Sequence, residues 1–238
     1  MNAAAPLLDV SAVSAGYSGE LVVHDVTFAV APGEAVAIIG SNGAGKSTLF
    51  RAIVSIVRKG AGTVRLDGTD VGRLATHRIS RLGLAYVPAE RHLFPQMSVA
   101  ENLRLGAYPG RPDPGVERTV YELFPRLHER LRQAAGTMSG GEQQMLAVAR
   151  ALMSQPRVLL LDEPSTGLSP RIAHEAYQAL ARLRDSGMTL VVAEQQVPLA
   201  LDLAERGYVI EHGRIVLGGT STELAGNPEV QRAYLGVA

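Results

Sequence analysis

Short apolar runs alternate with longer segments of mixed polarity along most of this chain. Runs rich in valine, isoleucine and leucine predict buried strands, and the segments between them show the spacing of apolar positions expected of helices. This alternation is typical of an α/β protein with a largely parallel, buried sheet. The predicted strands are residues 26–30, 35–39, 84–87, 158–161 and 189–193, and the predicted helices are residues 46–57, 141–154, 172–185 and 198–205.

Hairpin signals interrupt this pattern near both ends of the chain. Those in the first third predict a small antiparallel β layer beside the parallel core. The later one predicts a second hairpin. The segments concerned are residues 13–17, 22–24, 63–66 with a turn at Asp67-Gly68, and 208–217.

The middle of the chain, residues 95–154, shows no strand signal. Three helix-like segments are separated there by the proline- and glycine-rich residues 108–115. We therefore predict one domain over residues 1–238, in which a helical subdomain, residues 95–154, is inserted into an α/β core. That core comprises residues 1–94 and 155–238.

Composition narrows the possible functions. The chain carries 23 basic and 23 acidic side chains, and this balance argues against binding nucleic acid by phosphate neutralisation. It has no cysteine, which excludes disulfides and thiolate chemistry and suits a reducing compartment. No apolar run approaches the roughly 20 residues needed to cross a bilayer, and the first residues lack the features of a secretory signal peptide. We therefore expect a cytoplasmic chain without a membrane span.

A glycine-rich segment at residues 40–48 matches the pattern G-x-x-x-x-G-K-[ST] between a predicted strand and a predicted helix. Glycines let the backbone wrap a polyphosphate, and the following helix adds its positive N-terminus. We expect Lys46 to reach the β- and γ-phosphates and Ser47 to ligate Mg²⁺. The pattern therefore predicts nucleotide binding rather than an ordinary turn. The predicted loop is Gly40, Ser41, Asn42, Gly43, Ala44, Gly45, Lys46, Ser47 and Thr48.

Two carboxylates, Asp162 and Glu163, directly follow the predicted strand at residues 158–161. By itself such a pair usually marks only the point where the chain emerges into solvent. Beside a phosphate loop it predicts a metal ligand at Asp162 and, at Glu163, a base that activates water for attack on the γ-phosphate.

A third segment, Ser139, Gly140 and Gly141, opens the predicted helix at residues 141–154. Its amides and hydroxyl group suit an anion, although a structural N-cap explains Ser139 equally well. The apolar stripe along this helix predicts core packing rather than a cofactor site.

In this order, the phosphate loop, the Ser-Gly-Gly-Glu-Gln-Gln segment and the Leu-Leu-Leu-Asp-Glu-Pro segment resemble the nucleotide-binding subunit of an ABC transporter, over nearly the whole chain. The resemblance implies an ATPase with the phosphate-loop NTPase fold that takes ATP and Mg²⁺. It also implies a head-to-tail dimer, in which Ser139, Gly140 and Gly141 serve the partner's nucleotide. Tyr17 matches the aromatic position that stacks on adenine; the alternative is a half-buried strand tyrosine.

Further stretches resemble the LivF type of ABC subunit, one of two ATPases in importers of branched-chain amino acids. This implies a second ATPase, two membrane permease subunits and, indirectly, an external substrate-binding protein, with this chain peripheral at the cytoplasmic face of the inner membrane. Related urea and amide importers carry similar sequences and remain an alternative. The stretches are residues 83–88, 94–103, 162–170 and 227–236.

Three positions depart from the family pattern, each in an element that couples the sites. Ala89 stands where most members have a glutamine that helps to bind metal and senses the membrane subunits, and a one-residue shift turns Glu90 to the other face of an extended segment. Gln195 replaces the switch histidine; it can hydrogen-bond the γ-phosphate but cannot carry a proton. Ser169 replaces an aspartate. We therefore expect ATP binding with hydrolysis that depends on the partner.

Two other functions stay open. A soluble ABC protein that acts on DNA or ribosomes usually carries a long coiled-coil insertion or two cassettes, and this chain has neither. A non-catalytic subunit that senses ATP is the other alternative, and Ala89, Gln195 and Ser169 motivate it.

Overall fold

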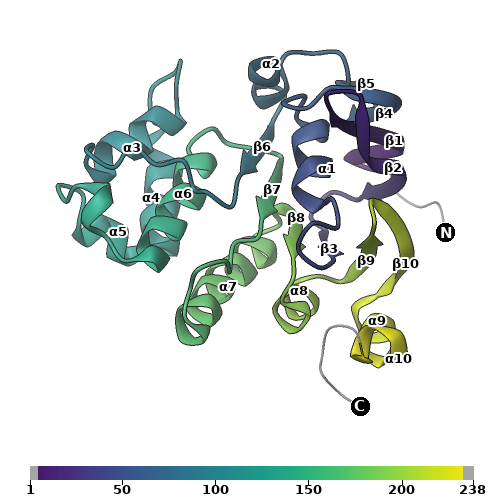
Figure 1. The fold of residues 1–238 in the computed structure, drawn as a ribbon. Helices are drawn as coiled ribbons and strands as arrows, with labels where there is room; N and C mark the ends of the chain where they lie inside the picture. The colour runs from purple at the N-terminus through teal and green to yellow at the C-terminus, as the bar shows by residue number, and fades with distance from the viewer. Residues whose placement is uncertain (1–4, 233–238) are drawn as a thin grey trace.

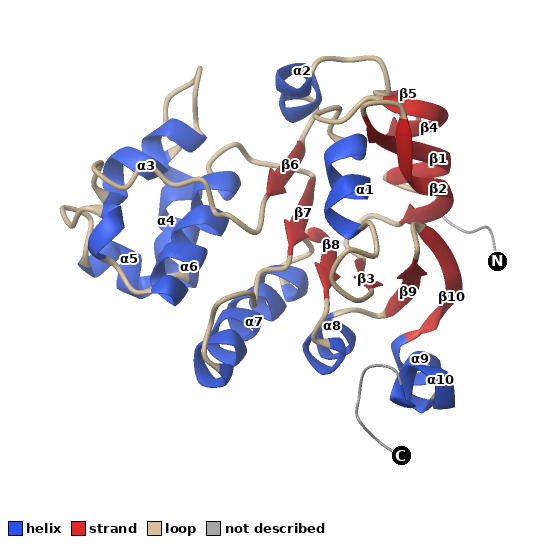
Figure 2. Cartoon of the chain, in the orientation of Figure 1, coloured by secondary structure: helices blue, strands red, loops and turns tan. Residues whose placement is uncertain are grey.

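A six-stranded sheet forms the centre of the computed structural model, which describes residues 5–232 (Figures 1 and 2). From edge to edge its strands are β10 (Arg214–Thr220), β9 (Arg206–Glu211), β3 (Ala35–Ile39), β8 (Thr189–Glu194), β7 (Val158–Asp162) and β6 (Leu84–Val87). All neighbours pair in parallel except β10, which is antiparallel to β9 and completes the second predicted hairpin. The ends of the predicted domain 1–238, and the end of the LivF-like stretch 227–236, lie outside the described residues.

The central strands are buried on both faces, as their continuous apolar runs predict. Every residue of β3, β7 and β8 is buried. Ala37 packs into one core and Ile38 into another, because successive side chains of a strand point to opposite faces of the sheet. The helices that cover the two faces are α1 (Lys46–Ile53), α6 (Gly140–Leu152), α7 (Pro170–Asp185) and α8 (Val197–Leu203).

A second, antiparallel sheet lies beside the first and packs against the core around α1 (Figure 1). Its strands, in order, are β2 (Glu20–Val30), β1 (Leu8–Tyr17), β4 (Lys59–Leu66) and β5 (Thr69–Asp70). The predicted antiparallel layer is thus confirmed, but the assignment of residues 26–30 to the parallel sheet is wrong, because they belong to β2. Only alternate residues there, Val26 and Phe28 among them, are buried, and such one-sided burial suits an antiparallel strand.

Helix α1 begins at Lys46 as predicted but ends at Ile53 rather than at residue 57. Ser55 adopts a left-handed backbone conformation with φ 58°. The N–H group of Ile56 then bonds to the carbonyl of Arg51 at 2.8 Å, which closes the helix. Apolar residues continue past this point, so the periodic pattern overstated the length of the helix.

Helices fill the segment between β6 and β7, where no strand was predicted (Figure 2). They are α3 (Val99–Gly106), α4 (Pro114–Leu123), α5 (Pro125–Glu129), a 3₁₀ helix (Ala135–Thr137) and α6. The structure divides this segment into more helices than the three predicted, since Pro125 begins a new helix directly after α4. The domain boundaries at residues 94–95 and 154–155 stay a prediction.

Shorter helices complete the described chain. They are α2 (Thr76–Arg81), α9 (Ser221–Gly226) and α10 (Pro228–Val230). Between residues 5 and 232, no helix combines the length and the apolar character that a membrane crossing requires.

Candidate functional site

The predicted phosphate loop connects β3 to α1. Gly43 and Gly45 have φ angles of 80° and 107°, which favour glycine, and Gly45 precedes α1 without any side-chain cap. A Cβ atom at Gly40 would lie 2.5 Å from the carbonyl oxygen of Ile210, so β9 leaves room only for glycine. The uncapped helix N-terminus can therefore bind an anion through its backbone amides.

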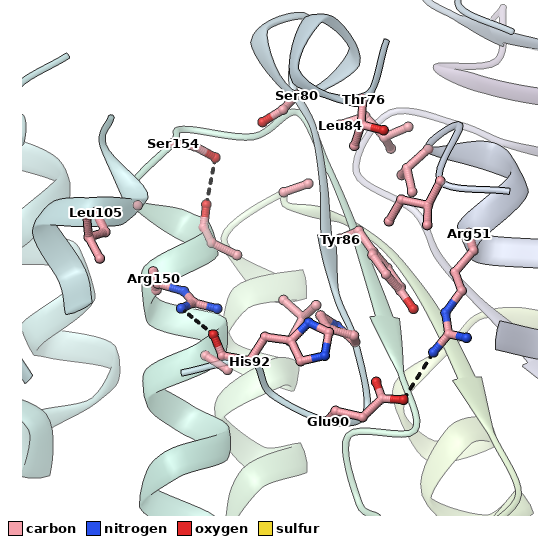
Figure 3. Close-up of a pocket in the computed structure, with 18 of the residues that line it drawn as sticks. Arg51, Thr76, Ser80, Leu84, Tyr86, Glu90, His92, Leu105, Arg150 and Ser154 are labelled. Carbon is pink, nitrogen blue, oxygen red and sulfur yellow. Dashed lines mark hydrogen bonds and ion pairs between the residues drawn. The ribbon is translucent and has the colours of Figure 1, made fainter. Parts of the chain in front are cut away.

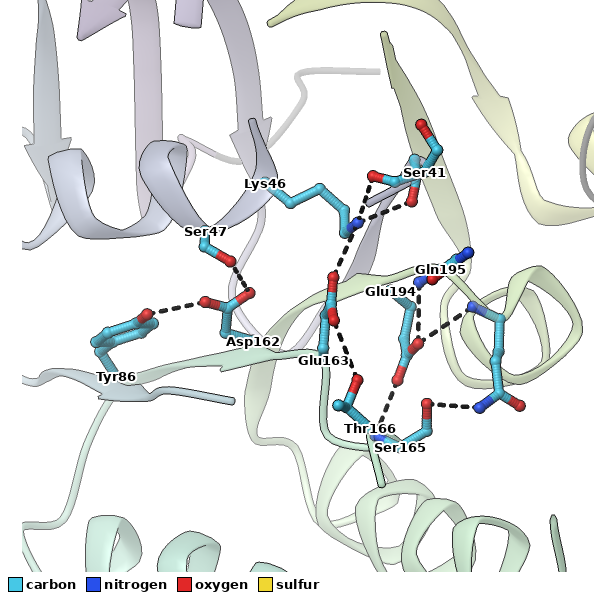
Figure 4. A network of polar contacts seen from close by, with 12 residues as sticks. Ser41, Lys46, Ser47, Tyr86, Asp162, Glu163, Ser165, Thr166, Glu194 and Gln195 are labelled. Carbon is cyan, nitrogen blue, oxygen red and sulfur yellow. Dashed lines mark hydrogen bonds and ion pairs between the residues drawn. The ribbon is translucent and has the colours of Figure 1, made fainter. Parts of the chain in front are cut away.

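Lys46 lies inside this loop and is only 3% exposed. Its Nζ donates to the carbonyl oxygens of Gly40 at 2.8 Å and Ser41 at 2.9 Å. The same Nζ forms an ion pair with Glu163 Oε1 at 3.0 Å (Figure 4). The structure thus joins two predicted site residues that are far apart in the sequence.

Asp162 ends β7 and is almost completely buried. Its Oδ1 accepts a hydrogen bond from Ser47 Oγ at 3.0 Å, and its Oδ2 accepts one from the Tyr86 hydroxyl at 2.9 Å (Figure 4). Burial raises the pKa of Asp162, and the hydrogen bonds from Tyr86 and Ser47 oppose this shift. The hydroxyl and carboxylate oxygens of Ser47 and Asp162 fit Mg²⁺, which prefers oxygen ligands.

Glu163 follows in a left-handed conformation with φ 46°. One carboxylate oxygen faces Lys46, and the other accepts a hydrogen bond from Thr166 Oγ1 at 3.0 Å. The strand exit and these two contacts fix the direction of the carboxylate, which a base needs before it can act on water.

A buried carboxylate that sequence reasoning missed, Glu194, joins two loops behind this group (Figure 4). It accepts hydrogen bonds from the backbone N–H groups of Ser165 at 3.0 Å, Gln195 at 3.0 Å and Gln196 at 3.2 Å. The Gln196 side chain also donates to Ser165 Oγ at 2.9 Å. The structure thus places Gln195 directly after β8, with its side chain exposed. In the sequence, Glu194 is a single glutamate at the end of an apolar strand, and this pattern does not predict that it joins two loops.

The segment Ser139, Gly140 and Gly141 begins α6. Ser139 and Glu142 form a capping box: the Glu142 N–H donates to Ser139 Oγ at 3.3 Å, and the Ser139 N–H donates to Glu142 Oε2 at 2.9 Å. A Cβ atom at Gly141 would lie 2.1 Å from Ile172 Cγ2 of α7. The N-cap alternative for Ser139 therefore describes a contact that exists, and helix packing requires glycine at residue 141.

Tyr17 ends β1 and is 45% exposed. It lines a cleft of about 760 Å³. Arg51, Tyr86 and Glu90 line the same cleft (Figure 3). An exposed ring can stack on an aromatic base.

The loop after β6, which contains the departure Ala89, holds contacts that the sequence did not reveal. Glu90 forms an ion pair with Arg51 of α1 at 3.1 Å. The next residue, Arg91, donates from Nε to Gln144 Oε1 of α6 at 3.1 Å and from a terminal nitrogen to the Thr166 carbonyl at 3.1 Å. Residues 89 and 90 form a turn, closed by the Arg91 N–H group bonding to the Pro88 carbonyl at 3.0 Å. The expectation of an extended segment at Ala89 and Glu90 is therefore wrong, and strand alternation does not apply there.

With this geometry in place, comparison with known proteins identifies the family. Residues 23–166 match the family described as ABC transporter. The chain belongs to the ABC transporter family. Like other ABC ATPases it binds and hydrolyses ATP, with Mg²⁺ as the usual metal, and such ATPases work as dimers together with membrane permease subunits.

Curated relatives extend this match over nearly the whole chain. It is 46% identical to the high-affinity branched-chain amino acid transport ATP-binding protein BraG of Pseudomonas aeruginosa, over 97% of this chain and 100% of BraG. It is 34% identical to the probable branched-chain amino acid transport ATP-binding protein LivF of Archaeoglobus fulgidus, over 94% and 97% of the two chains. It is also 37% identical to the lipopolysaccharide export system ATP-binding protein LptB of Escherichia coli, over 92% and 93%.

Solved structures confirm the ABC ATPase fold. An ATP-binding cassette of an ABC transporter superposes with a TM-score of 0.84 at 23% identity, over 97% of this chain and 99% of that chain. An ATP-binding subunit of an ABC transporter superposes with a TM-score of 0.81 at 28% identity, over 97% and 96%. The predicted core, antiparallel layer and inserted helices are therefore those of this family.

Proposed function

We propose that this chain is the ATPase subunit of an importer for branched-chain amino acids. The observation that carries the proposal is the 46% identity to BraG, which spans the full length of that protein. LivF of Archaeoglobus fulgidus, also described as a branched-chain amino acid transport protein, supports the same substrate class.

In this proposal the phosphate loop, residues 40–48, binds the ATP phosphates, and Lys46 neutralises their charge. Ser47 and Asp162 would hold Mg²⁺, which supplies further charge neutralisation when bound. Glu163 acts as the base for the attacking water, because its carboxylate already lies beside Lys46. Gln195 hydrogen-bonds the γ-phosphate without carrying charge.

The remaining roles depend on partners. Tyr17 stacks on the adenine of the chain's own ATP, and Ser139, Gly140 and Gly141 contact the nucleotide bound by the opposing subunit. We further propose that the opposing subunit is a second, related ATPase. The two ATPases together dock on two permeases at the cytoplasmic face of the inner membrane. An external binding protein delivers the substrate to those permeases.

Specific observations bear on the alternatives. The identity to the exporter subunit LptB is lower, at 37%, than the identity to BraG, at 46%. Transport of urea or amides is the second candidate, because the LivF-like stretches do not determine which substrate is transported. The matched relatives are described as transport subunits, which supports transport over action on DNA or ribosomes. The intact pair of Lys46 and Glu163 supports hydrolysis over ATP sensing alone.

Uptake measurements in the source cells test this proposal. We expect Glu163→Gln on the chromosome to reduce uptake of radiolabelled leucine, isoleucine and valine to background, while the exposed Glu175→Gln control retains uptake. Unchanged leucine uptake together with lost urea uptake would transfer the assignment to the second candidate. Unchanged uptake of both would reject import of either substrate.

A further inference from the structure

The two oxygens of the Asp162 carboxylate have different hydrogen-bond donors. Ser47 comes from the phosphate loop and is itself a proposed metal ligand. Tyr86 comes from the edge strand β6 and lies outside the loop. Its hydroxyl donates to the second oxygen of Asp162 at 2.9 Å, so it fixes the orientation of this carboxylate from outside the phosphate loop.

Packing holds the Tyr86 ring in this direction. The ring meets Phe50 of α1 edge to face, with centroids 6.4 Å apart and planes at 86°. Because Phe50 is fully buried, the ring has a fixed support, and its hydroxyl is aimed at a fixed point.

Arg51 connects this hydroxyl to the loop after β6. It lies next to Phe50 on α1, and its guanidinium group faces both Glu90 and the hydroxyl end of Tyr86 (Figure 3). Hydrogen bonding with Tyr17 and Tyr86 raises the pKa of Arg51 above its usual value. Glu90 is about half exposed, and such an ion pair contributes at most about 1 kcal/mol, so movement of the loop can break it.

We infer that Tyr86 is a positioning residue for Asp162, and that the Arg51–Glu90 ion pair makes this positioning depend on the loop after β6. The inference rests on the proposed role of Asp162 as a metal ligand. It assigns a path from the loop to the metal in a chain whose Ala89 offers no ligand atom. The loop after β6 then acts on Asp162 through Glu90, Arg51 and Tyr86, and no side chain of the loop needs to bind the metal itself.

The test measures ATP affinity with Mg²⁺ and with EDTA, using the full chain with Glu163→Gln so that ATP persists. We expect Tyr86→Phe to weaken affinity in Mg²⁺ by about three- to tenfold and to leave affinity in EDTA unchanged, because only the metal-dependent part needs Asp162. Tyr121→Phe is the matched control, since that tyrosine stacks on His128 in the helical segment. Equal losses in Mg²⁺ and EDTA, or no loss, would overturn the inference.

A second pair of variants tests the link to the loop and does not depend on how well Tyr86→Phe folds. Glu90→Gln should weaken only the affinity in Mg²⁺, by up to about threefold, and should add little to Tyr86→Phe in the double variant. Additive losses would reject the shared path. Asp162→Asn distinguishes failure of the proposed metal site from failure of the positioning role. If Asp162→Asn leaves the effect of Mg²⁺ on ATP affinity unchanged, the proposed metal site is wrong. If Asp162→Asn abolishes that effect while Tyr86→Phe does not change it, only the positioning role is rejected.

Discussion

The phosphate loop and the segment at Ser139 are both short glycine-containing sequences at helix N-termini, yet their contacts differ. Lys46 and Ser47 contact carboxylates that arrive from the distant strand β7. Ser139 bonds to Glu142, three residues along its own helix. The first motif is therefore explained by a site within this chain. The second is explained within the chain by local structure, so its proposed role in ATP binding depends on a partner.

Removing the proposed base has the largest expected effect. Glu163→Gln should lower ATP turnover by about 10² to 10⁴-fold while ATP binding persists, because the amide cannot take a proton from water. Steady-state phosphate release from the purified chain and its partners measures this. The exposed Glu175→Gln serves as control. Near-normal turnover in Glu163→Gln would show that another group is the base.

The buried carboxylate behind the site gives the next effect. Glu194→Gln replaces an acceptor of three backbone N–H bonds by an amide, and we expect a loss of about 1.5–3 kcal/mol in the free energy of unfolding. Urea denaturation measures it, with the exposed Glu122→Gln as reference. A loss as small as that of the reference would mean that Glu194 does not hold the two loops together.

Gly141→Ala tests whether packing fixes the glycine of the second motif. The added Cβ would collide with Ile172, so we expect a loss of about 1–3 kcal/mol in the free energy of unfolding. Shortening the opposing side chain in the double variant with Ile172→Ala should recover part of it. Gly226→Ala, where a Cβ meets nothing within 4 Å, is the control. If Gly141→Ala is as stable as the unmodified protein, packing against Ile172 does not require this glycine, and contact with a ligand is the explanation that is left.

Ser139→Ala has the smallest effect and makes the sharpest comparison. Ser98 caps α3 with the same capping box, so either substitution should cost about 1 kcal/mol of stability. If Ser139 also contacts the partner's ATP, only Ser139→Ala should weaken ATP-dependent dimerisation, measured by sedimentation velocity. Equal dimerisation of the two variants would reduce Ser139 to a helix cap.

These contrasts also show what could be predicted from the sequence. The places of the loop from Gly40 to Thr48 and of Asp162 and Glu163 at strand ends were predictable, because glycine spacing and strand ends are local features; their roles stay predictions. The length of α1 was not, since the left-handed Ser55 ends the helix within an apolar run. Residues 26–30 were assigned to the wrong sheet because a short apolar run does not reveal whether one or both of its faces are buried.

Contacts between distant segments escaped prediction for a different reason. Tyr86 and Arg51 lie in a predicted strand and a predicted helix but in none of the predicted sites, and only the fold brings them to Asp162 and Glu90. At Glu194 the sequence pattern indicates only the polar end of a strand. Such side chains carry no motif of their own, so their roles follow from three-dimensional proximity alone.

The ion pair between Lys46 and Glu163 has a consequence for timing. An ammonium group surrounded by two carbonyls and a carboxylate has little capacity for another partner, so a phosphate that takes Lys46 competes with Glu163 for it. With Glu163 as the proposed base, arrival of the substrate is then the event that frees the base. Glu163 could then activate water only after ATP has bound. Part of the binding free energy of ATP would be used to separate Lys46 from Glu163.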